Sequence, residues 1–220
     1  MNKFVAVIPV RQGSQRVKNK NFKSFCGKSL LEHKIDMIKK LPVEKIIVNT
    51  DSKFAIEIAK KNKIDYLERE EYFASSECTN SEYHEYLANV TNSENILIAQ
   101  VTAPLINYET YIEAIDLFYN NKCDSLMSVK EVKEFLWFEN KPVNYELKTA
   151  PNSQNLPEFF TPTFGIVIVK KESMLEDKNF ICGNPFFYKI SQEESIDIDT
   201  EVDFEFAEFL FKKKISNKNL

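Results

Sequence analysis

FVAVIPVRQGSQRVKNKN (residues 4–21) is the stretch of sequence that decides the fold. Its first half is a short, β-branched apolar run, which predicts a buried strand over Val5–Pro9. Its second half is a loop over Val10–Asn21, with one glycine at a turn and several basic residues. In an open parallel sheet, ligands bind beyond the carboxyl ends of the strands, which is where this loop would lie.

This loop has the composition of a phosphate site. Backbone N–H groups at the turn, together with Arg11 and Lys20, would suit the oxygens of a phosphate or another polyanion. The glycine pattern is neither that of a P-loop nor that of a dinucleotide-binding fingerprint. On spacing alone, a solvated basic loop therefore remains the alternative interpretation.

Strand and helix patterns alternate along the rest of the chain. This rhythm is typical of a parallel sheet with helices on both faces. We therefore predict an α/β protein with a three-layer, doubly wound, mostly parallel sheet, built as one domain over residues 1–220. The remaining strands are expected at Lys45–Asn49, Ile96–Val101, Asp124–Val129 and Gly165–Val169, and the helices at Ser29–Leu41, Lys53–Asn62, Ser81–Val90, Glu109–Asn120 and after an N-cap formed by Thr200 and Asp203.

The alternation stops between residues 130 and 162. Four prolines, at positions 142, 151, 157 and 162, punctuate a segment that is rich in aromatic residues and has little helical period. We interpret this segment as a small insertion that carries substrate or partner contacts.

The composition excludes several classes of protein. With 43% hydrophobic and 28% charged residues the chain is globular, and its net charge of −4 disfavours a nucleic-acid partner. No apolar run is long enough to cross a bilayer, and the first residues lack the cleavage site of a signal peptide. The four cysteines, at positions 26, 78, 123 and 182, show no metal-binding spacing. We therefore expect a cytoplasmic protein with reduced cysteines and no membrane partner.

Acidic residues near the end of the chain are the strongest candidates for chemistry, because His33 and His84 lie in helical patterns without ligand spacing. Asp197 and Asp199 alternate with isoleucines, which places both carboxylates on one face of an extended segment. Two converging carboxylates form a hard-oxygen site suited to Mg²⁺. Two alternatives remain open: Asp199 caps the last helix, or an aspartate acts directly as a general base.

A third aspartate, Asp51, has an alternative of its own. It ends a predicted strand just before a predicted helix, where aspartate is a favoured N-cap.

Six short motifs follow one another along nearly the whole chain: IPVRQGS (8–14) with KNKN (18–21), VNTD (48–51), Arg69 with FAS (73–75), QVTAPL (100–105), QNLP (154–157) and SIDIDTE (195–201). Together and in this order they resemble the acylneuraminate cytidylyltransferases, the CMP-N-acetylneuraminic acid synthetase family. The resemblance implies a Rossmann-like nucleotidyltransferase fold. It also implies transfer of CMP from CTP to the anomeric hydroxyl of an acidic sugar, with release of pyrophosphate, for surface glycan or capsule synthesis.

The resemblance assigns roles residue by residue. It implies CTP and an acidic sugar as substrates, Mg²⁺ as cofactor, and a homodimer with residues 130–162 as its interface and a source of sugar-side contacts. It implies catalytic roles for Arg11, Lys20 and Asp199, and Mg²⁺ ligation by Asp197 and Asp199. The implied CTP contacts are Arg11, Gly13, Ser14, Lys20, Asn21, Arg69, Cys78, Asn80 and Gln100, and the implied sugar contacts are Thr102, Gln154, Phe186 and Phe187.

Three sugar-side positions depart from the family pattern. Ile106 and Ser153 stand where members commonly have arginine, and Phe164 interrupts the usual Pro-Asn-Gly. Loss of arginine from a carboxylate site removes a bidentate partner. A different acidic acceptor, such as a Kdo-like sugar, a sugar phosphate or a phosphonate, is therefore the alternative. A nucleotide-binding module without catalysis is disfavoured because Arg11 and Lys20 occur together with both aspartates.

Overall fold

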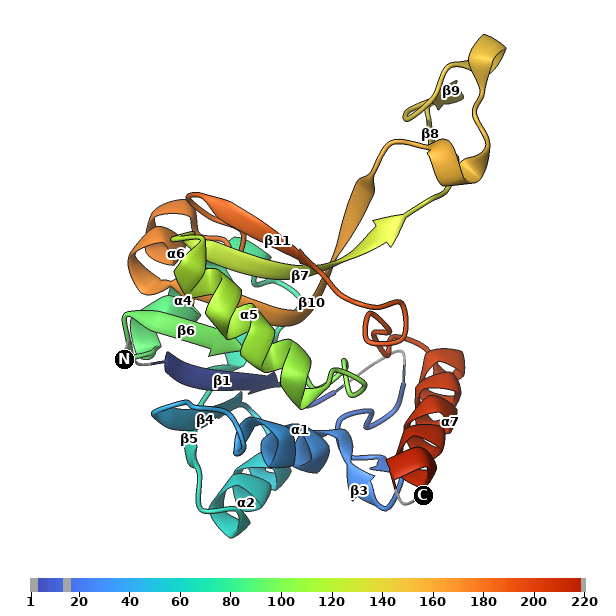
Figure 1. The fold of residues 1–220 in the computed structure, drawn as a ribbon. Helices are drawn as coiled ribbons and strands as arrows, with labels where there is room; N and C mark the ends of the chain where they lie inside the picture. Colours follow the sequence, from blue (N-terminus) through green and yellow to red (C-terminus); the bar gives the residue numbers. More distant parts are fainter. Residues whose placement is uncertain (1–3, 14–16, 219–220) are drawn as a thin grey trace.

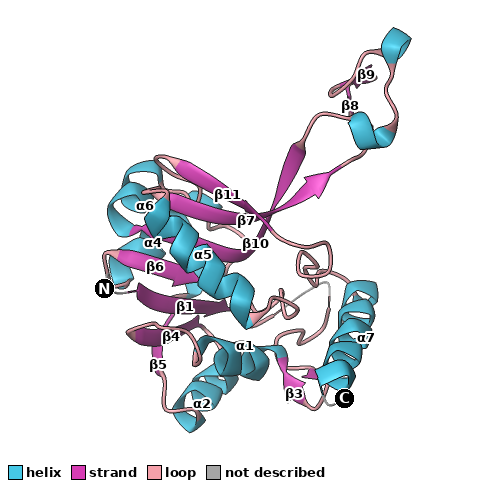
Figure 2. Ribbon diagram, viewed as in Figure 1, coloured by secondary structure: helices cyan, strands magenta, loops and turns pink. Residues whose placement is uncertain are grey.

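A single large sheet organises the molecule (Figures 1 and 2). The computed structural model describes residues 4–13 and 17–218. Within these residues, seven strands form the sheet in the order β5-β4-β1-β6-β10-β7-β11. All are mutually parallel except β10, which runs antiparallel to both of its neighbours. The strands are β1 (Phe4–Val10), β4 (Lys45–Thr50), β5 (Asp65–Glu68), β6 (Asn95–Ile98), β7 (Ser125–Val132), β10 (Phe159–Lys170) and β11 (Pro185–Lys189).

Helices cover both faces of this sheet, as the alternation of strands and helices predicts. Along β1, Phe4, Ala6 and Ile8 point into one hydrophobic cluster, while Val5 and Val7 point into the other. The first cluster packs against helices α1 (Leu30–Ile38), α2 (Lys53–Lys61), α5 (Tyr108–Asn120) and α7 (Glu201–Lys218), and the second against α4 (Asn80–Val90) and α6 (Lys171–Asp177). The three-layer, mostly parallel α/β architecture is thus confirmed.

The predicted strands and helices are found, although two strands differ in extent and several elements, among them α6, were not predicted. The expected strand at Gly165–Val169 is the end of the longer, antiparallel β10. The expected strand at Ile96–Val101 ends at Ile98, and Gln100–Ile106 forms a turn beyond it. The edge strands β5 and β11 were not predicted, because their side chains are mostly exposed or half-buried and lack the continuous apolar run of a central strand.

Residues 133–158 form an arm that projects from the body of the molecule (Figure 1). The ladder between β7 and β10 continues outward to the pair Val132 and Phe159, and the arm grows from its end. It carries the short hairpin of β8 (Trp137–Phe138) and β9 (Lys141–Pro142), two 3₁₀ turns (Leu147–Thr149 and Ser153–Asn155), and a surface rich in exposed apolar side chains.

Helix α1 carries a lysine into the core. The helix begins at a reciprocal capping box between Ser29 and Glu32. The buried apolar residues of the helix face the sheet. Lys34 lies among them and is only 3% exposed. Its ammonium donates to the carbonyl oxygen of Ala103 at 2.8 Å and to the hydroxyl of Tyr111 at 2.9 Å. Burial lowers the pKa of Lys34 to about 7, while the charge of Asp197 acts to raise it.

The burial of Lys34 predicts a pH-dependent stability. Between about pH 7 and the ordinary pKa of lysine, the unfolded chain binds a proton at Lys34 that the folded chain releases. The free energy of unfolding should therefore rise with pH in this window, by about 1.4 kcal/mol per pH unit from this site. In urea denaturation, the stability of Lys34→Met relative to the unmodified chain should fall as the pH rises from 7 to 10. A difference independent of pH would contradict the lowered pKa.

Candidate active site

The loop after β1 is supported from the neighbouring strand. The backbone N–H of Gln12 donates to the carboxylate of Asp51 at 2.7 Å, just beyond the end of β4. Helix α2 is capped by Ser52, whose hydroxyl accepts from the N–H of Ala55. The N-cap alternative for Asp51 is therefore wrong, and its carboxylate instead orients the loop. Gly13 continues this loop with a φ of +79°, a conformation that disfavours other residues, and Ser14 lies outside the described residues.

The loop after β1 also contacts the segment around Ala74. The guanidinium of Arg11 donates to the carbonyl oxygen of Ala74 at 3.4 Å. Asn21 donates through its side-chain nitrogen to the carbonyl oxygen of Arg11 at 3.2 Å. Among the residues that the structure describes, the buried side-chain oxygen of Asn21 has no hydrogen-bond partner. A buried acceptor without a donor is costly in an isolated chain, so it is a natural contact for a ligand that brings a donor.

Arg69 is the centre of a polar hydrogen-bond network near this segment. It is 7% exposed and donates to the side chain of Asn49 at 2.8 Å and to the hydroxyl of Tyr83 at 2.9 Å. Burial raises the pKa of Tyr83 to about 12, although the charge of Arg69 acts to lower it. Tyr83 therefore stays protonated and donates to Asn49 at 3.1 Å. Cys78 and Asn80 lie nearby along the chain, the first half-buried and the second exposed at the start of α4.

Lys20 joins the first loop to the acidic segment near the end of the chain. Lys20 is 8% exposed, and its ammonium donates to the carbonyl oxygen of Ile198. The same ammonium lies 3.7 Å from a carboxylate oxygen of Asp199. Ile198 is fully buried, whereas Asp197 is exposed and Asp199 is half-buried. The alternation predicted for this segment therefore places both carboxylates on the outer side.

The cap of α7 settles the alternative role of Asp199. Thr200 and Asp203 form a reciprocal pair, in which Asp203 accepts from the N–H of Thr200 at 2.7 Å and Thr200 accepts from the N–H of Asp203 at 3.2 Å. Asp203 also accepts from the N–H of Asp199 at 3.1 Å. The predicted N-cap of Thr200 and Asp203 is confirmed, and the side chain of Asp199 does not cap this helix.

The donor set fits Mg²⁺. In the part of the chain that the structure describes, no group of three or more histidine, cysteine or acidic side chains is arranged to hold a metal. Mg²⁺ commonly uses one or two carboxylates, completed by water and substrate phosphates. Asp197 and Asp199, both with surface access at this edge, match that requirement.

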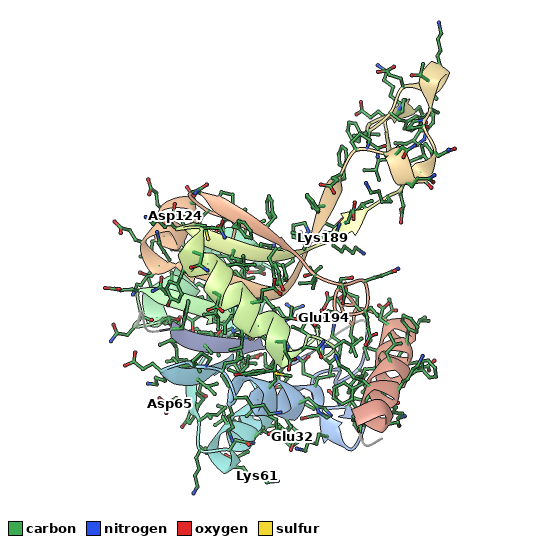
Figure 3. All side chains as sticks on the ribbon, in the orientation of Figure 1. Glu32, Lys61, Asp65, Asp124, Lys189 and Glu194 are labelled. Carbon is green, nitrogen blue, oxygen red and sulfur yellow. The ribbon has the colours of Figure 1, made fainter. Side chains whose placement is uncertain are left out.

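Glu194 fixes the acidic segment to the body of the protein, and sequence analysis missed it. It lies in the loop between β11 and α7 (Figure 3), 8% exposed. Its carboxylate accepts from the N–H of Asn107 at 2.9 Å, from the hydroxyl of Thr110 at 2.6 Å and from the hydroxyl of Ser191 at 2.9 Å. A few residues on, the N–H of Ile198 donates to the carbonyl oxygen of Thr102 at 2.9 Å. The signal in the sequence was Ser191-x-x-Glu194, which has the spacing of a capping box.

The remaining predicted contacts divide into two groups. Gln100 and Thr102 lie in the turn after β6, beside the acidic segment. Three others are not brought to this edge in a single chain. Gln154 is exposed on the arm, Phe186 packs against the core from edge strand β11, and Phe187 is 45% exposed on the opposite side of that strand.

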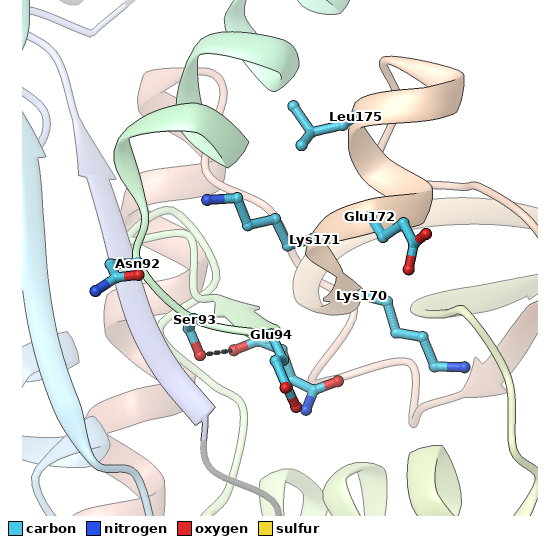
Figure 4. A pocket seen from close by; sticks show the side chains of 8 residues that line it. Asn92, Ser93, Glu94, Lys170, Lys171, Glu172 and Leu175 are labelled. Atoms are coloured by element: carbon cyan, nitrogen blue, oxygen red, sulfur yellow. Dashed lines mark hydrogen bonds between the residues drawn. The ribbon is translucent and has the colours of Figure 1, made fainter.

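The hollow shown in Figure 4 lies elsewhere. Its volume is about 740 Å³, and it is bordered by the start of β6 at Asn95 and the end of β10 at Lys170. These residues mark the edge of the sheet opposite to the loop after β1. Its lysines are already bonded, Lys170 to Asp124 at 2.7 Å and Lys171 to the carbonyl oxygen of Thr91 at 3.0 Å. None of the residues that line this hollow belongs to the site predicted from the sequence.

Fold and site together define a class of nucleotidyltransferase-like α/β proteins. The chain superposes with a TM-score of 0.72 on the structure of CMP:2-keto-3-deoxy-manno-octonic acid synthetase complexed with CTP, at 13% identity, covering 97% of this chain and 100% of that one. The model of the family described as cytidylyltransferase matches residues 5–216, so the chain belongs to the cytidylyltransferase family.

Two relatives are similar to this chain over most of its length. The N-acylneuraminate cytidylyltransferase of Streptococcus agalactiae serotype III is 27% identical over 92% of this chain, but the match spans only 52% of that relative. The chain thus spans about half the length of that protein. The pseudaminic acid cytidylyltransferase of Campylobacter jejuni serotype O:2 is 25% identical over 96% of this chain and 97% of its own length. Among the described residues, no helix is both long and apolar enough to cross a membrane.

The contacts of Glu194 predict a large effect on stability. Glu194→Ala would leave the N–H of Asn107 and the hydroxyl of Thr110 without their buried acceptor, so the free energy of unfolding should fall by about 2–3 kcal/mol in urea denaturation. Glu194→Gln keeps one acceptor oxygen and should lose clearly less. Equal losses in the two variants would show that the negative charge of Glu194, rather than an acceptor oxygen at this place, carries the stabilisation.

Proposed function

We propose that this chain transfers CMP from CTP to the anomeric hydroxyl of an acidic sugar, a sialic acid or a related nonulosonic acid, and releases pyrophosphate. The observation that carries the proposal is the placement of Lys20 against Ile198 and Asp199 beside the loop of residues 11–13. The ammonium of Lys20, the carboxylates of the acidic segment and the backbone of the loop therefore lie at the same edge of the sheet. Membership of the cytidylyltransferase family supports this assignment.

Positioning and charge neutralisation are what the reaction requires. The sugar hydroxyl attacks the α-phosphorus, a new P–O bond forms, the bond to the bridging oxygen of pyrophosphate breaks, and the hydroxyl proton is lost. Arg11 and Lys20 would hold the phosphate oxygens, and Gly13 and Asn21 would line the turn beneath them. Mg²⁺ bound to Asp197 and Asp199 would neutralise phosphate charge and favour ionisation of the sugar hydroxyl.

The base and ribose would lie on the β4–β5 side of this centre. There the network of Arg69 and Tyr83 would form a rigid floor bordered by Cys78 and Asn80, whereas Gln100 would approach from the turn after β6. The side-chain oxygen of Asn21, which has no partner among the described residues, would receive a donor from the nucleotide. Rigid, already bonded groups bind a ligand with little loss of conformational entropy.

The acceptor would enter from the side of β6 and β10, where Thr102 lies. The two relatives are named for N-acylneuraminate and for pseudaminic acid, both acidic sugars. One observation favours a different acidic acceptor as second candidate. Ile106 is 2% exposed and packs in the core, so this position offers no cation to a sugar carboxylate. A Kdo-like sugar, a sugar phosphate or a phosphonate is the alternative.

Pyrophosphate release from CTP, in the presence of Mg²⁺ and a panel of 2-keto acid sugars, tests the proposal. Asp199→Asn should lower turnover by about 100-fold or more while CTP affinity measured by calorimetry changes by no more than about threefold, because the carboxylate acts mainly on charge developing in the transition state. Glu201→Gln, an exposed carboxylate two residues away that pairs with Lys23, is the matched control. Full turnover by Asp199→Asn would contradict the proposed role of Asp199 in binding Mg²⁺. Absence of pyrophosphate release with every acceptor would contradict the proposed enzymatic activity.

We further propose a cytoplasmic homodimer assembled through the arm. The arm exposes Trp137 (53%), Phe138 (69%) and Leu147 (62%), more apolar surface than a projecting hairpin needs for its own folding. Pairing of two arms would cover this surface and would bring the exposed Gln154 of one subunit toward the other.

Light scattering after size exclusion tests the assembly. The unmodified protein should have about twice the 25.7 kDa mass of the chain, and the double variant Phe138→Asp with Leu147→Asp should be monomeric. Phe209→Asp, an equally exposed change on α7, should remain dimeric. A monomeric unmodified protein, or a dimer that survives both arm substitutions, would contradict the proposed interface.

A further inference from the structure

Lys34 is a lysine on the face of α1 that is otherwise apolar and buried. The other buried residues of this helix are Leu30, Leu31, Ile35 and Ile38, and Lys34 is as deeply buried as they are, at 3% exposed. Burial of an amine costs free energy, and an apolar side chain of similar volume often gives a protein that is equally or more stable. The stability of the core therefore does not explain a lysine at this position.

The bonds of Lys34 link α1 to three other elements. Its amine donates to the carbonyl oxygen of Ala103, in the turn after β6, and to the hydroxyl of Tyr111 on α5. Burial, together with the charge of Glu194, raises the pKa of Tyr111 above its ordinary value, so the hydroxyl keeps its proton. That hydroxyl donates to the carbonyl oxygen of Gly165 in β10 at 3.4 Å. Lys34 thus fixes the turn after β6 relative to α1, α5 and β10.

The turn of residues 100–106 holds the acidic segment. The carbonyl oxygen of Thr102 accepts from the N–H of Ile198 at 2.9 Å, between the two proposed Mg²⁺ ligands. The next carbonyl oxygen, that of Ala103, accepts from Lys34 at 2.8 Å. Two successive carbonyl groups of the turn are therefore bonded, one by the acidic segment and one by the buried amine. A shift of the turn would move Ile198 and the carboxylates that flank it.

Two further contacts hold the other end of this stretch. Lys214 donates to the carbonyl oxygen of Leu105 at 2.9 Å, and Glu194 accepts from the N–H of Asn107 at 2.9 Å. Lys34, by contrast, bonds the residue directly after the one that holds the acidic segment. Its contact is therefore the one best placed to control the position of that segment.

We infer that Lys34 is a positioning residue for the reaction, which acts by fixing the turn that orients Asp197 and Asp199. This inference rests on the proposed function. Lys34 is too deeply buried to touch a substrate, so its effect on turnover passes through the turn. A displacement of about 1 Å at a reacting centre can cost about 100-fold in rate, so a small relaxation of the turn is enough to lower kcat.

Lys34→Met tests this inference, because methionine is similar in length and has no hydrogen-bond donor. With CTP, Mg²⁺ and a 2-keto acid sugar that the unmodified protein accepts, kcat should fall by about 10-fold or more at pH 7. The KM for CTP should stay within about twofold, because the Arg69 side of the site is left in place. A purely structural role would instead leave the kcat of the folded variant unchanged.

Hydrogen exchange measures the position of the acidic segment without relying on turnover. The N–H of Ile198 is bonded to the turn, so its exchange should be faster in Lys34→Met by about 10-fold or more. The N–H of Ile8, in the central strand β1, should exchange at the same rate in both proteins. Faster exchange at both amides would indicate a general loss of stability, and an unchanged rate at Ile198 would contradict the positioning role.

Two variants accompany Lys34→Met. Lys171→Met is the matched control, since Lys171 also donates to a backbone carbonyl oxygen, that of Thr91 at 3.0 Å, but at the opposite edge of the sheet. It should change neither kcat nor the exchange of Ile198. Tyr111→Phe keeps the ring and removes one acceptor of Lys34, so it should lower kcat in the same direction but less. This second variant decides the matter if Lys34→Met does not fold.

The outcomes separate this inference from the proposed function. Absence of pyrophosphate release by the unmodified protein with every acceptor would contradict the proposed function, on which the inference rests. Release by the unmodified protein, with unchanged kcat in Lys34→Met and in Tyr111→Phe, would leave the function standing and refute the role of Lys34. An equal fall of kcat in Lys171→Met would also refute it, because the effect would not depend on the turn.

Discussion

The bond from the buried ammonium of Lys20 to the carbonyl oxygen of Ile198 is the contact on which the site depends. It connects residues 178 positions apart in the sequence and places a cation next to Asp199. The charge of Lys20 cannot be solvated by water at 8% exposure, so it needs the carbonyl dipole and the nearby carboxylate. The carboxylate, in turn, is oriented by a segment whose central isoleucine is locked in the core. Removing the carboxylate of Asp199 would weaken the electrostatic compensation of the buried ammonium of Lys20.

The other supports of the site follow the same plan, in which a group outside the reaction centre fixes the backbone of a group inside it. Asp51 holds the loop of Gln12 from the next strand, and Glu194 holds the acidic segment against the start of α5. Lys34 reaches the turn of Ala103 from below. These three contacts come from different parts of the chain. A rigid frame of this kind lets a few exposed side chains act without reorganising when substrate arrives.

Much of this arrangement could be predicted from residue patterns, and the reasons for the rest are physical. The strand at Val5–Pro9, the cap at Thr200 and the outward face of Asp197 and Asp199 follow from periodicity and local hydrogen bonding, which operate over a few residues. The support roles of Asp51 and Glu194 do not, because each carboxylate bonds to a partner 39 to 87 positions away. The edge strands β5 and β11 have too little buried surface to be distinguished from loops. The positive φ of Phe164 (+55°) lies at a register shift between β7 and β10, which no local pattern reveals.

The separation of Lys20 from Ile198 has a consequence for synthesis on the ribosome. Chains emerge from their N-terminal end, so the loop of Arg11 and Lys20 is made early and must wait for the last quarter of the chain before its cation has a partner. Until residue 199 has left the exit tunnel, the positively charged loop has no access to these carboxylates. A nascent or truncated chain therefore has neither the acidic pair nor the completed edge of the sheet. The site is complete only when the segment of Ile198 and Asp199 packs against the loop of Lys20.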